Sequence, residues 1–168
     1  MKRIIIQGSS RSDGNTSKVV ALLRQQLEFD LIDLNEKNIG HFDYDFNNRD
    51  DDFMPIFRDI ANNYDLIVFA TPVYWYTMSG LMKVFFDRIS DGLIVDKPTG
   101  RKLRGKSMAS ISCGSDDHLP EGYEVPFRES AGYLGMHWLG HLHTWVEDGK
   151  APEELVVERV TKFVKKIT

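Results

Sequence analysis

Hydrophobic positions along the chain switch between two patterns, the unbroken runs of buried strands and the wider spacing typical of helices. The run at 66–70, for example, has no polar position and predicts a parallel strand that is covered on both faces. Strands are predicted at 3–7, 29–34, 66–70, 107–112 and 138–144. Helices are predicted at 15–27, 52–63, 81–89 and 127–134, with a last helix that carries Pro152 in its first turn and ends at 167.

Strands that alternate with helices predict an α/β domain built on one doubly wound parallel sheet, with right-handed crossovers and helices on both faces. Of the two common doubly wound orders, 2-1-3-4-5 fits five strands best. In that order the winding reverses between the first and third strands, so a ligand crevice is expected at their carboxyl ends. No linker, repeat or low-complexity tract divides residues 1–168, and a single domain is expected.

A segment of small and hydroxyl-bearing residues, the serine-rich loop (residues 7–17, QGSSRSDGNTS), leaves the first strand and enters the first helix. The first turn of a helix has unpaired N–H groups and the positive end of the dipole, and Arg11 adds a charge. The sequence therefore predicts a phosphate site. Asn15 stands where a nucleotide-triphosphate loop needs lysine, and the dinucleotide pattern G-x-G-x-x-G is absent. A single terminal phosphomonoester is favoured.

The segment after the third strand, the aromatic loop (residues 70–80, ATPVYWYTMSG), is expected beside the serine-rich loop. It contains three consecutive aromatic residues, Tyr74, Trp75 and Tyr76, where exposure to solvent is expected. Aromatic faces and backbone N–H groups beside a phosphate site would suit a flat polar heterocycle. The same side chains would suit a subunit interface, and the two interpretations are compatible.

The formal net charge is −4 with both signs well mixed, so the composition does not favour binding to nucleic acid or to an anionic membrane. No apolar run approaches the length that spans a membrane. Cys113 is the only cysteine, which excludes an internal disulfide and a cysteine-based metal cluster within one chain. We therefore expect a soluble, cytoplasmic protein whose partner is a small molecule, with no nucleic-acid or membrane partner.

Two motifs together resemble those of a known family. The patterns G-S-x-R-x-x-G-N-T after the first strand and T-P-V-Y-W-x-x-x-S-G-x-x-K-x-F-x-D-R after the third are similar to those of the flavodoxin-like NADPH-dependent FMN reductases. That group also includes NAD(P)H:quinone reductases and iron-sulfur flavoproteins. The resemblance extends over nearly the whole chain, and it implies a flavodoxin-like fold, noncovalent FMN and NAD(P)H as electron donor. Because sites in related flavoproteins are often completed by a second chain, the exposed aromatic residues favour a homo-oligomer, and a homodimer is expected, with a tetramer as the alternative.

The resemblance also implies which residues bind FMN. The phosphate would be held by Ser9, Arg11, Ser12, Asn15, Thr16 and Ser17. The ring would be lined, largely through backbone groups, by Pro72, Val73, Tyr74 and Trp75, and closed on its other side by Ser112, Gly114 and Ser115. Iron-sulfur members carry clustered cysteines between the second strand and second helix. Residues 41–52 contain none, so no such cluster is expected.

The implied activity is the passage of hydride from NAD(P)H through FMN to a small acceptor, such as a flavin, a quinone, or an azo or nitro compound. The cofactor carries this chemistry, so no catalytic side chain and no metal ligand is assigned. The alternative is a flavodoxin-type single-electron carrier. Arg11 and the modest net charge favour the reductase, because such carriers tend to be more acidic and typically lack this arginine.

Residues outside these motifs receive structural interpretations. Cys113 is expected to be a small packed residue, and His141 and His143, although at metal-ligand spacing, are expected to be ordinary histidines at the rim of the sheet. His118 is a candidate for steadying the substrate over the flavin.

Charged segments are expected to be exposed to solvent. The Asp-rich segment 43–52 lacks the ligand spacing of an EF-hand and is predicted as a solvated loop. The basic segment 97–106 is predicted as a solvated turn. Lys83, Asp87 and Arg88 are predicted at the surface or at an interface.

Overall fold

The structure, a computed structural model, describes residues 1–168 and contains one sheet in which all neighbouring strands run parallel. The strands are β1 (Arg3–Gln7), β2 (Asp30–Asp33), β3 (Leu66–Pro72), β4 (Ser107–Gly114) and β5 (His137–Trp145). Their order is β2-β1-β3-β4-β5, which confirms the predicted flavodoxin-like arrangement. β1 pairs with β2 on one side and with β3 on the other, so the winding reverses at the predicted place.

Helices connect all the strands. They are α1 (Asn15–Gln26), α2 (Phe53–Asn63), α3 (Gly80–Ile94), α4 (Lys97–Gly100), α5 (Val125–Leu134) and α6 (Glu154–Ile167), with 3₁₀ turns η1 (Leu34–Glu36) and η2 (Arg101–Leu103). The placement of Pro152 in the first turn of the last helix was wrong, because Glu153 is the extended N-cap of α6 and Pro152 precedes it. None of the helices combines the length and the apolar composition that crossing a membrane requires.

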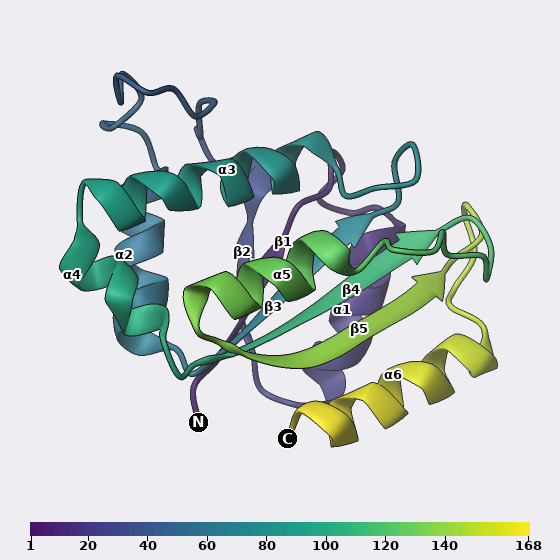
Figure 1. Cartoon of the computed structure of the whole chain (residues 1–168). Coiled ribbons are helices and arrows are strands. Elements are labelled where there is room, and N and C mark those ends of the chain that lie inside the picture. The colour runs from purple at the N-terminus through teal and green to yellow at the C-terminus, as the bar shows by residue number, and fades with distance from the viewer.

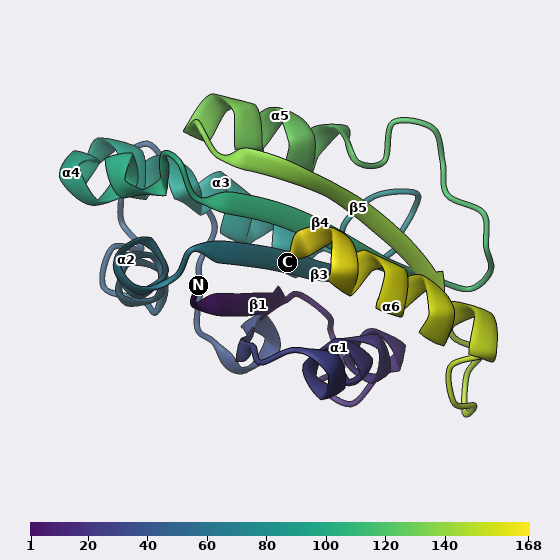
Figure 2. The ribbon, with the colours of Figure 1, turned by 90° about the horizontal axis from the view of Figure 1, so that it is seen from below.

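The helices form a layer on each face of the sheet (Figures 1 and 2). Successive side chains of a strand point to opposite faces, and in β1 Ile5 contributes to one core while Ile4 and Ile6 contribute to the other. α1 and α6 lie side by side over the Ile5 face. α2, α3 and α5 cover the second face, where phenylalanine rings of all three helices interlock. The central strands β1, β3 and β4 are thus buried on both faces, as the apolar run at 66–70 predicts, whereas the edge strand β2 is partly exposed.

Arg88 of α3 is buried, with a side chain only 1% exposed, so its placement at the surface was wrong. Its Nε donates to Asp91 at 2.7 Å, and one terminal nitrogen donates to Asp51 at 2.5 Å and to the Gly40 carbonyl at 2.9 Å. The other terminal nitrogen donates to the Asn48 carbonyl at 3.0 Å and to Asp51 at 3.2 Å. All five N–H groups of the guanidinium therefore have acceptors.

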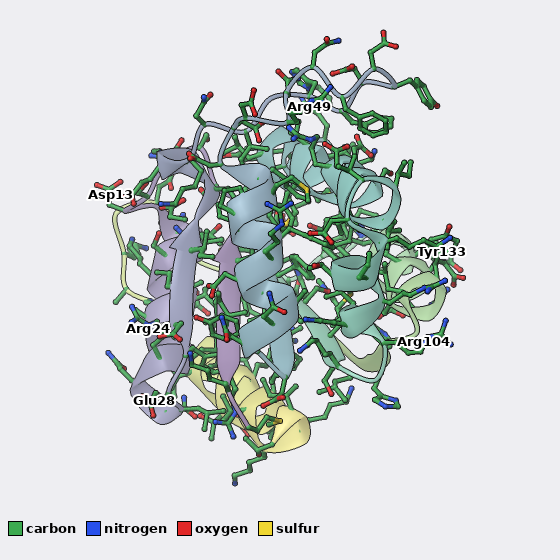
Figure 3. The ribbon with its side chains drawn as sticks, turned by 90° about the vertical axis from the view of Figure 1, so that its left-hand side faces the viewer. Asp13, Arg24, Glu28, Arg49, Arg104 and Tyr133 are labelled. Atoms are coloured by element: carbon green, nitrogen blue, oxygen red, sulfur yellow. The ribbon has the colours of Figure 1, made fainter.

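The Arg88 cluster (Arg88, Asp51 and Asp91) fastens the segment before α2 onto α3. The prediction of a solvated loop for 43–52 was wrong at its end, since the Asp51 side chain is 8% exposed. Burial opposes ionisation of this carboxyl, but hydrogen bonds from Arg88 and from backbone amides hold the pKa of Asp51 below its ordinary value. Arg49, two residues earlier, lies on the part of the loop outside the helical layer (Figure 3).

The basic segment 97–106 forms α4 and η2, so the prediction of a turn was wrong, but four of its basic residues are exposed to solvent as predicted: Lys97, Arg101, Lys102 and Arg104. The Asp96 side chain caps α4 by accepting from the Thr99 amide, and Leu103 is buried in the core. This segment precedes β4 and so lies at the amino ends of the strands, at the far end of the sheet from the loops described next (Figure 1).

Candidate functional site

Four segments surround one cleft at the carboxyl ends of the strands, the place predicted for a ligand crevice. The loops after β3, β4 and β5 gather at this end of the sheet (Figure 1). The cleft has a volume of about 300 Å³. It is lined by the serine-rich loop and the start of α1 (Ser9, Arg11, Asn15, Thr16), the aromatic loop (Pro72, Val73, Tyr74), the end of β4 and the next residue (Cys113, Gly114, Ser115) and the segment after β5 (Val146, Glu147, Asp148).

The N-terminus of α1 presents hydrogen-bond donors that the protein itself does not use. The backbone amides of Asn15, Thr16 and Ser17 have no acceptor in the chain, and the first helical bond runs from Lys18 to Gly14 at 3.3 Å. The N-cap residue is Gly14, which has no side chain to accept from them. Such free amides, together with the dipole, form an anion site.

Side chains add to this donor set. The Thr16 hydroxyl and the Arg11 guanidinium have no protein partner, and both residues line the cleft. The Ser9 hydroxyl, which is also at the cleft, meets only the Arg11 amide, at 3.4 Å. Asp13, the acidic residue of this loop, points away from the body of the protein (Figure 3). The loop therefore gathers donors and a positive charge around one place.

Two of the six residues predicted to hold phosphate lie behind the loop instead. The Ser17 hydroxyl donates to the Ser12 carbonyl at 2.5 Å and accepts from Gln7 Nε2 at 3.1 Å. The Ser12 hydroxyl accepts from Asn35 at 3.2 Å. Neither residue lines the cleft, and their hydrogen bonds fix the curvature of the loop.

The segment after β5 forms a wall that the sequence did not predict. Asn15 Nδ2 donates to the Val146 carbonyl at 2.8 Å and to Asp148 at 2.9 Å, which joins the start of α1 to this segment. The carboxylate of Glu147 pairs with Lys150 at 2.5 Å. The available signal was topological, because the end of a fifth parallel strand must lie at the same edge of the sheet as the other strand ends.

The tip of the aromatic loop is a strained turn. Tyr74 and Thr77 exchange both backbone hydrogen bonds, at 2.9 and 3.1 Å, and the two residues between them have positive φ angles of 47° (Trp75) and 66° (Tyr76). Positive φ at both central positions is the signature of a type I′ turn, which bulky side chains rarely adopt. The Tyr74 hydroxyl meets the Ser10 hydroxyl at 2.8 Å and so ties the aromatic loop to the serine-rich loop.

A second hollow of about 330 Å³ adjoins the cleft, with which it shares Val73, Gly114 and Ser115. Its other lining residues are Trp75, Tyr76, Asp116, His118 and Pro120. Trp75 is 91% exposed, so its indole faces open space at the edge of this hollow. His118, in the loop after β4, lines the same hollow, where it was predicted to steady a substrate. The cleft and the hollow form a continuous site with a polar end and an aromatic end.

Ser112 is fully buried and faces β5 rather than the cleft. Its hydroxyl lies 2.9 Å from Nε2 of His141 and 2.8 Å from Nδ1 of His143. The prediction that both histidines are ordinary rim residues was wrong, because both rings hydrogen-bond to hydroxyls of β4 and His143 is buried. Burial lowers the pKa of His141 to about 3 and lowers that of His143 as well. Cys113 does line the cleft as a packed side chain, and burial raises the pKa of its thiol to about 11.

Comparison with protein families agrees with this geometry. The family model of the NADPH-dependent FMN reductases matches residues 1–150. The chain belongs to this family. Membership confirms the predicted enzyme class, an NAD(P)H-dependent oxidoreductase, and with it FMN as the cofactor and NAD(P)H as the electron donor of the family.

Relatives of the reductase family are similar over much of their length. YwqN of Bacillus subtilis (strain 168), assigned as an NAD(P)H-dependent FMN-containing oxidoreductase, is 26% identical over 166 residues, which cover 93% of this chain and 90% of YwqN. The NADPH azoreductase of Bacillus sp. (strain OY1-2) is 29% identical over 98 residues, which cover 58% of this chain and 55% of that protein.

Solved structures share the reductase fold. The Trp repressor binding protein from Bacillus subtilis matches with a TM-score of 0.73 at 23% identity, over 99% of this chain and 98% of that one. The general stress protein 14 of Treponema denticola, solved in complex with FMN, matches with a TM-score of 0.63 at 16% identity, over 98% and 94% of the two chains. At these identities the likeness establishes the fold.

The donor set of this reductase fits the phosphate of FMN. A terminal phosphate is a compact anion with several acceptor oxygens, and the start of α1 provides free amides, two hydroxyls and a guanidinium around one point. The adjoining hollow offers aromatic faces and backbone to a flat ring system.

Proposed function

We propose that this protein binds FMN across the cleft and the hollow and passes hydride from NAD(P)H through it to a small acceptor, such as a flavin, a quinone, or an azo or nitro compound. The observation that carries this proposal is the set of unused donors at the start of α1, at one end of a site whose other end is aromatic. The cytoplasmic location and the homo-oligomer remain predictions.

The predicted cofactor residues take different roles in this proposal. Ser9, Arg11, Asn15 and Thr16 contact the phosphate, and Ser12 and Ser17 support their loop from behind. Pro72, Val73, Tyr74 and Trp75 lie along one side of the ring, and Gly114 and Ser115 along the other. Ser112 acts from the interior of the sheet through its hydrogen bonds.

FMN supplies the hydride chemistry when bound, and the protein supplies orientation and electrostatics. The free amides and Arg11 fix the phosphate end, so the ring is positioned by the length of the ribityl chain. Trp75 and the loop after β4 shield the ring from solvent, and His118 lies where it can orient an acceptor.

The test is an anaerobic absorption titration of the purified protein with FMN, followed by NADPH. We expect saturable binding of FMN and bleaching of its visible band by NADPH. Binding without bleaching would favour the single-electron carrier, and no binding would overturn the assignment of the cleft.

A substitution at Arg11 tests where the phosphate of FMN binds. Arg11→Met should weaken FMN binding about tenfold, because a charge-assisted hydrogen bond to phosphate is lost, while binding of riboflavin, which lacks the phosphate, should not change. Arg128→Met is the matched control, since Arg128 is a half-exposed arginine of α5, paired with Glu124 and away from the cleft. Equal FMN affinity for the two variants would contradict the phosphate assignment.

A further inference from the structure

A line of hydrogen-bonded side chains runs between β4 and β5 toward the cleft. The Ser110 hydroxyl lies 2.7 Å from Nδ1 of His141, and Nε2 of His141 lies 2.9 Å from the Ser112 hydroxyl. That hydroxyl lies 2.8 Å from Nδ1 of His143, whose Nε2 lies 3.0 Å from the backbone carbonyl of Asp116. The last residue belongs to the loop after β4 and lines the aromatic hollow.

Counting the donors and acceptors assigns each hydrogen in this line to one atom. The Asp116 carbonyl can only accept, so Nε2 of His143 carries the hydrogen and Nδ1, in a neutral ring, accepts from Ser112. The single hydrogen of Ser112 is then used, and Ser112 must accept from Nε2 of His141. Nδ1 of His141 in turn accepts from Ser110. Both rings are neutral Nε2–H tautomers, in agreement with the lowered pKa values that burial gives them.

His143 also packs against the backbone of this loop. A Cβ atom at Gly114 would lie 3.0 Å from Cε1 of the His143 ring, which is closer than the ring can tolerate without moving. Gly114 lines both the cleft and the hollow. One imidazole therefore contacts the wall of the site at Gly114 and holds it by a hydrogen bond at Asp116.

The sheet itself does not need this line. The backbone pairing of β4 with β5 continues from Ser107 to Gly114, and apolar side chains could fill the same space between the strands. Buried polar side chains cost free energy unless each one finds partners, and here they occupy four neighbouring inward positions of two strands. Such a line fixes one arrangement of the loop in a way that apolar packing would not.

We propose that His143 is the positioning residue for the wall of the flavin site: its Nε2–H holds the Asp116 carbonyl and so sets the place of residues 114–118 against the ring. The inference rests on the proposed function for its cofactor. The residue acts through the loop and does not contact the reacting atoms.

Two substitutions separate the two ends of the imidazole. His143→Gln keeps a donor near the position of Nε2, and it should bind FMN within about threefold of the wild type. His143→Asn ends near the position of Nδ1, keeps a partner for Ser112 and cannot reach Asp116, so FMN binding should weaken about tenfold or more. His137→Asn, at the exposed start of the same strand, is the control and should leave affinity unchanged. Equal affinity of the wild type and His143→Asn, or equal weakness of the Asn and Gln variants, would overturn the proposal.

A spectroscopic measurement on the protein without flavin tests the hydrogen-bond line directly. Long-range ¹H–¹⁵N spectra of the imidazoles at neutral pH should show Nε2–H tautomers for both His141 and His143, and an Nδ1–H tautomer at His143 would overturn the assignment. A failure of the proposed function would look different. The wild type and every variant would then bind no FMN, while the tautomers would still support or overturn the hold of His143 on Asp116.

Discussion

The Arg88 cluster and the serine-rich loop both gather strong hydrogen-bond donors beside a loop, yet they differ in what the donors meet. In the cluster, all five N–H groups of a buried guanidinium end on protein acceptors. In the serine-rich loop, three backbone amides, the Thr16 hydroxyl and the Arg11 guanidinium have no protein acceptor. One region lies under the loop before α2 and the other at the cleft.

The difference separates donors that hold the fold from donors that await a ligand. Substitution of a buried charge that has all its partners lowers stability, because those partners are left buried without a counter-charge. Unused donors facing water cost the fold little and are available to an anion. Counting acceptors therefore assigns a structural role to Arg88 and supports the binding role proposed for Arg11.

The strongest test of this comparison is Arg88→Met. The substitution leaves Asp51 and Asp91 buried without their counter-charge and should lower the free energy of unfolding by about 3–5 kcal/mol, measured by urea denaturation. FMN affinity of the folded protein should not change. Lys83→Met is the control on the same helix: its pair with Asp87 is exposed, and its loss should cost at most about 0.5 kcal/mol.

If Arg88→Met and Lys83→Met lowered the free energy of unfolding by the same amount, the structural role of the Arg88 cluster would be contradicted, and with it the contrast with the serine-rich loop. If Arg88→Met does not fold, the triple variant with Asp51→Asn and Asp91→Asn removes the buried charges as well. It should recover part of the lost stability, because uncompensated charge is the largest part of the penalty.

As the pH falls, the protein should lose stability through His141, at the site end of the sheet, at a higher pH than the one at which the Arg88 cluster responds. The pKa of His141 is about 3 in the folded protein, against an ordinary value of 6.5, so as pH falls below 6.5 the unfolded chain takes up a proton that the folded protein refuses. This contribution to stability is complete above pH 6.5 and is lost as pH falls toward 3. Urea denaturation should show a loss of about 2 kcal/mol between about pH 7.5 and pH 5.

The Arg88 cluster should not respond over that range, since the pKa of Asp51 is already below its ordinary value. The cost of Arg88→Met should be smaller at about pH 5 than at about pH 7.5, because without Arg88 burial raises the pKa of Asp51 and a protonated carboxyl carries no uncompensated charge. A wild-type stability that is equal at both would contradict the neutral, buried state of His141.

The smallest expected effect concerns strain at the aromatic tip. Trp75 has a left-handed backbone and is 91% exposed, so Trp75→Asn removes little packing and introduces a residue that tolerates this conformation. The protein without flavin should gain about 1 kcal/mol of stability in urea denaturation. FMN affinity should fall, because the indole borders the hollow.

Trp75→Ala is the matched control for strain. It removes the same ring but tolerates positive φ no better than tryptophan, and it should not stabilise the protein. Equal stabilisation by Asn and Ala would mean that the gain has another source than the backbone conformation.

The sequence was sufficient for the features that depend on neighbouring residues. The pattern of hydrophobic and polar positions located all five strands, and the donor-rich loop beside the aromatic loop located the cleft. Arg88 was misplaced because its partner Asp51 comes from a loop 37 residues away. Along α3 itself, the i,i+3 spacing of Arg88 and Asp91 does not distinguish a buried pair from an exposed one such as Lys83 and Asp87. The short helix α4 was missed because proline and glycine, at Pro98 and Gly100, are typical of turns, whereas capping by Asp96 and burial of Leu103 decide the outcome.

The site residues show the same limit at closer range. A serine in the serine-rich loop can face the cleft, as Ser9 does, or support the loop from behind, as Ser17 does, and local composition does not distinguish them. The role of Ser112 depends on two histidines of the neighbouring strand. The wall at 146–148 depends on a hydrogen bond to the Val146 carbonyl from Asn15, which lies 131 residues earlier in the sequence.

The cleft takes its walls from four segments, the first near Ser9 and the last near Asp148. During synthesis the polypeptide emerges in order, and the wall after β5 leaves the ribosome after the other three walls. A nascent chain therefore exposes the serine-rich loop long before it has a complete site to offer a cofactor. With the cleft as the proposed flavin site, capture of the cofactor is expected to follow pairing of β5, so that FMN stabilises only molecules whose sheet is already complete.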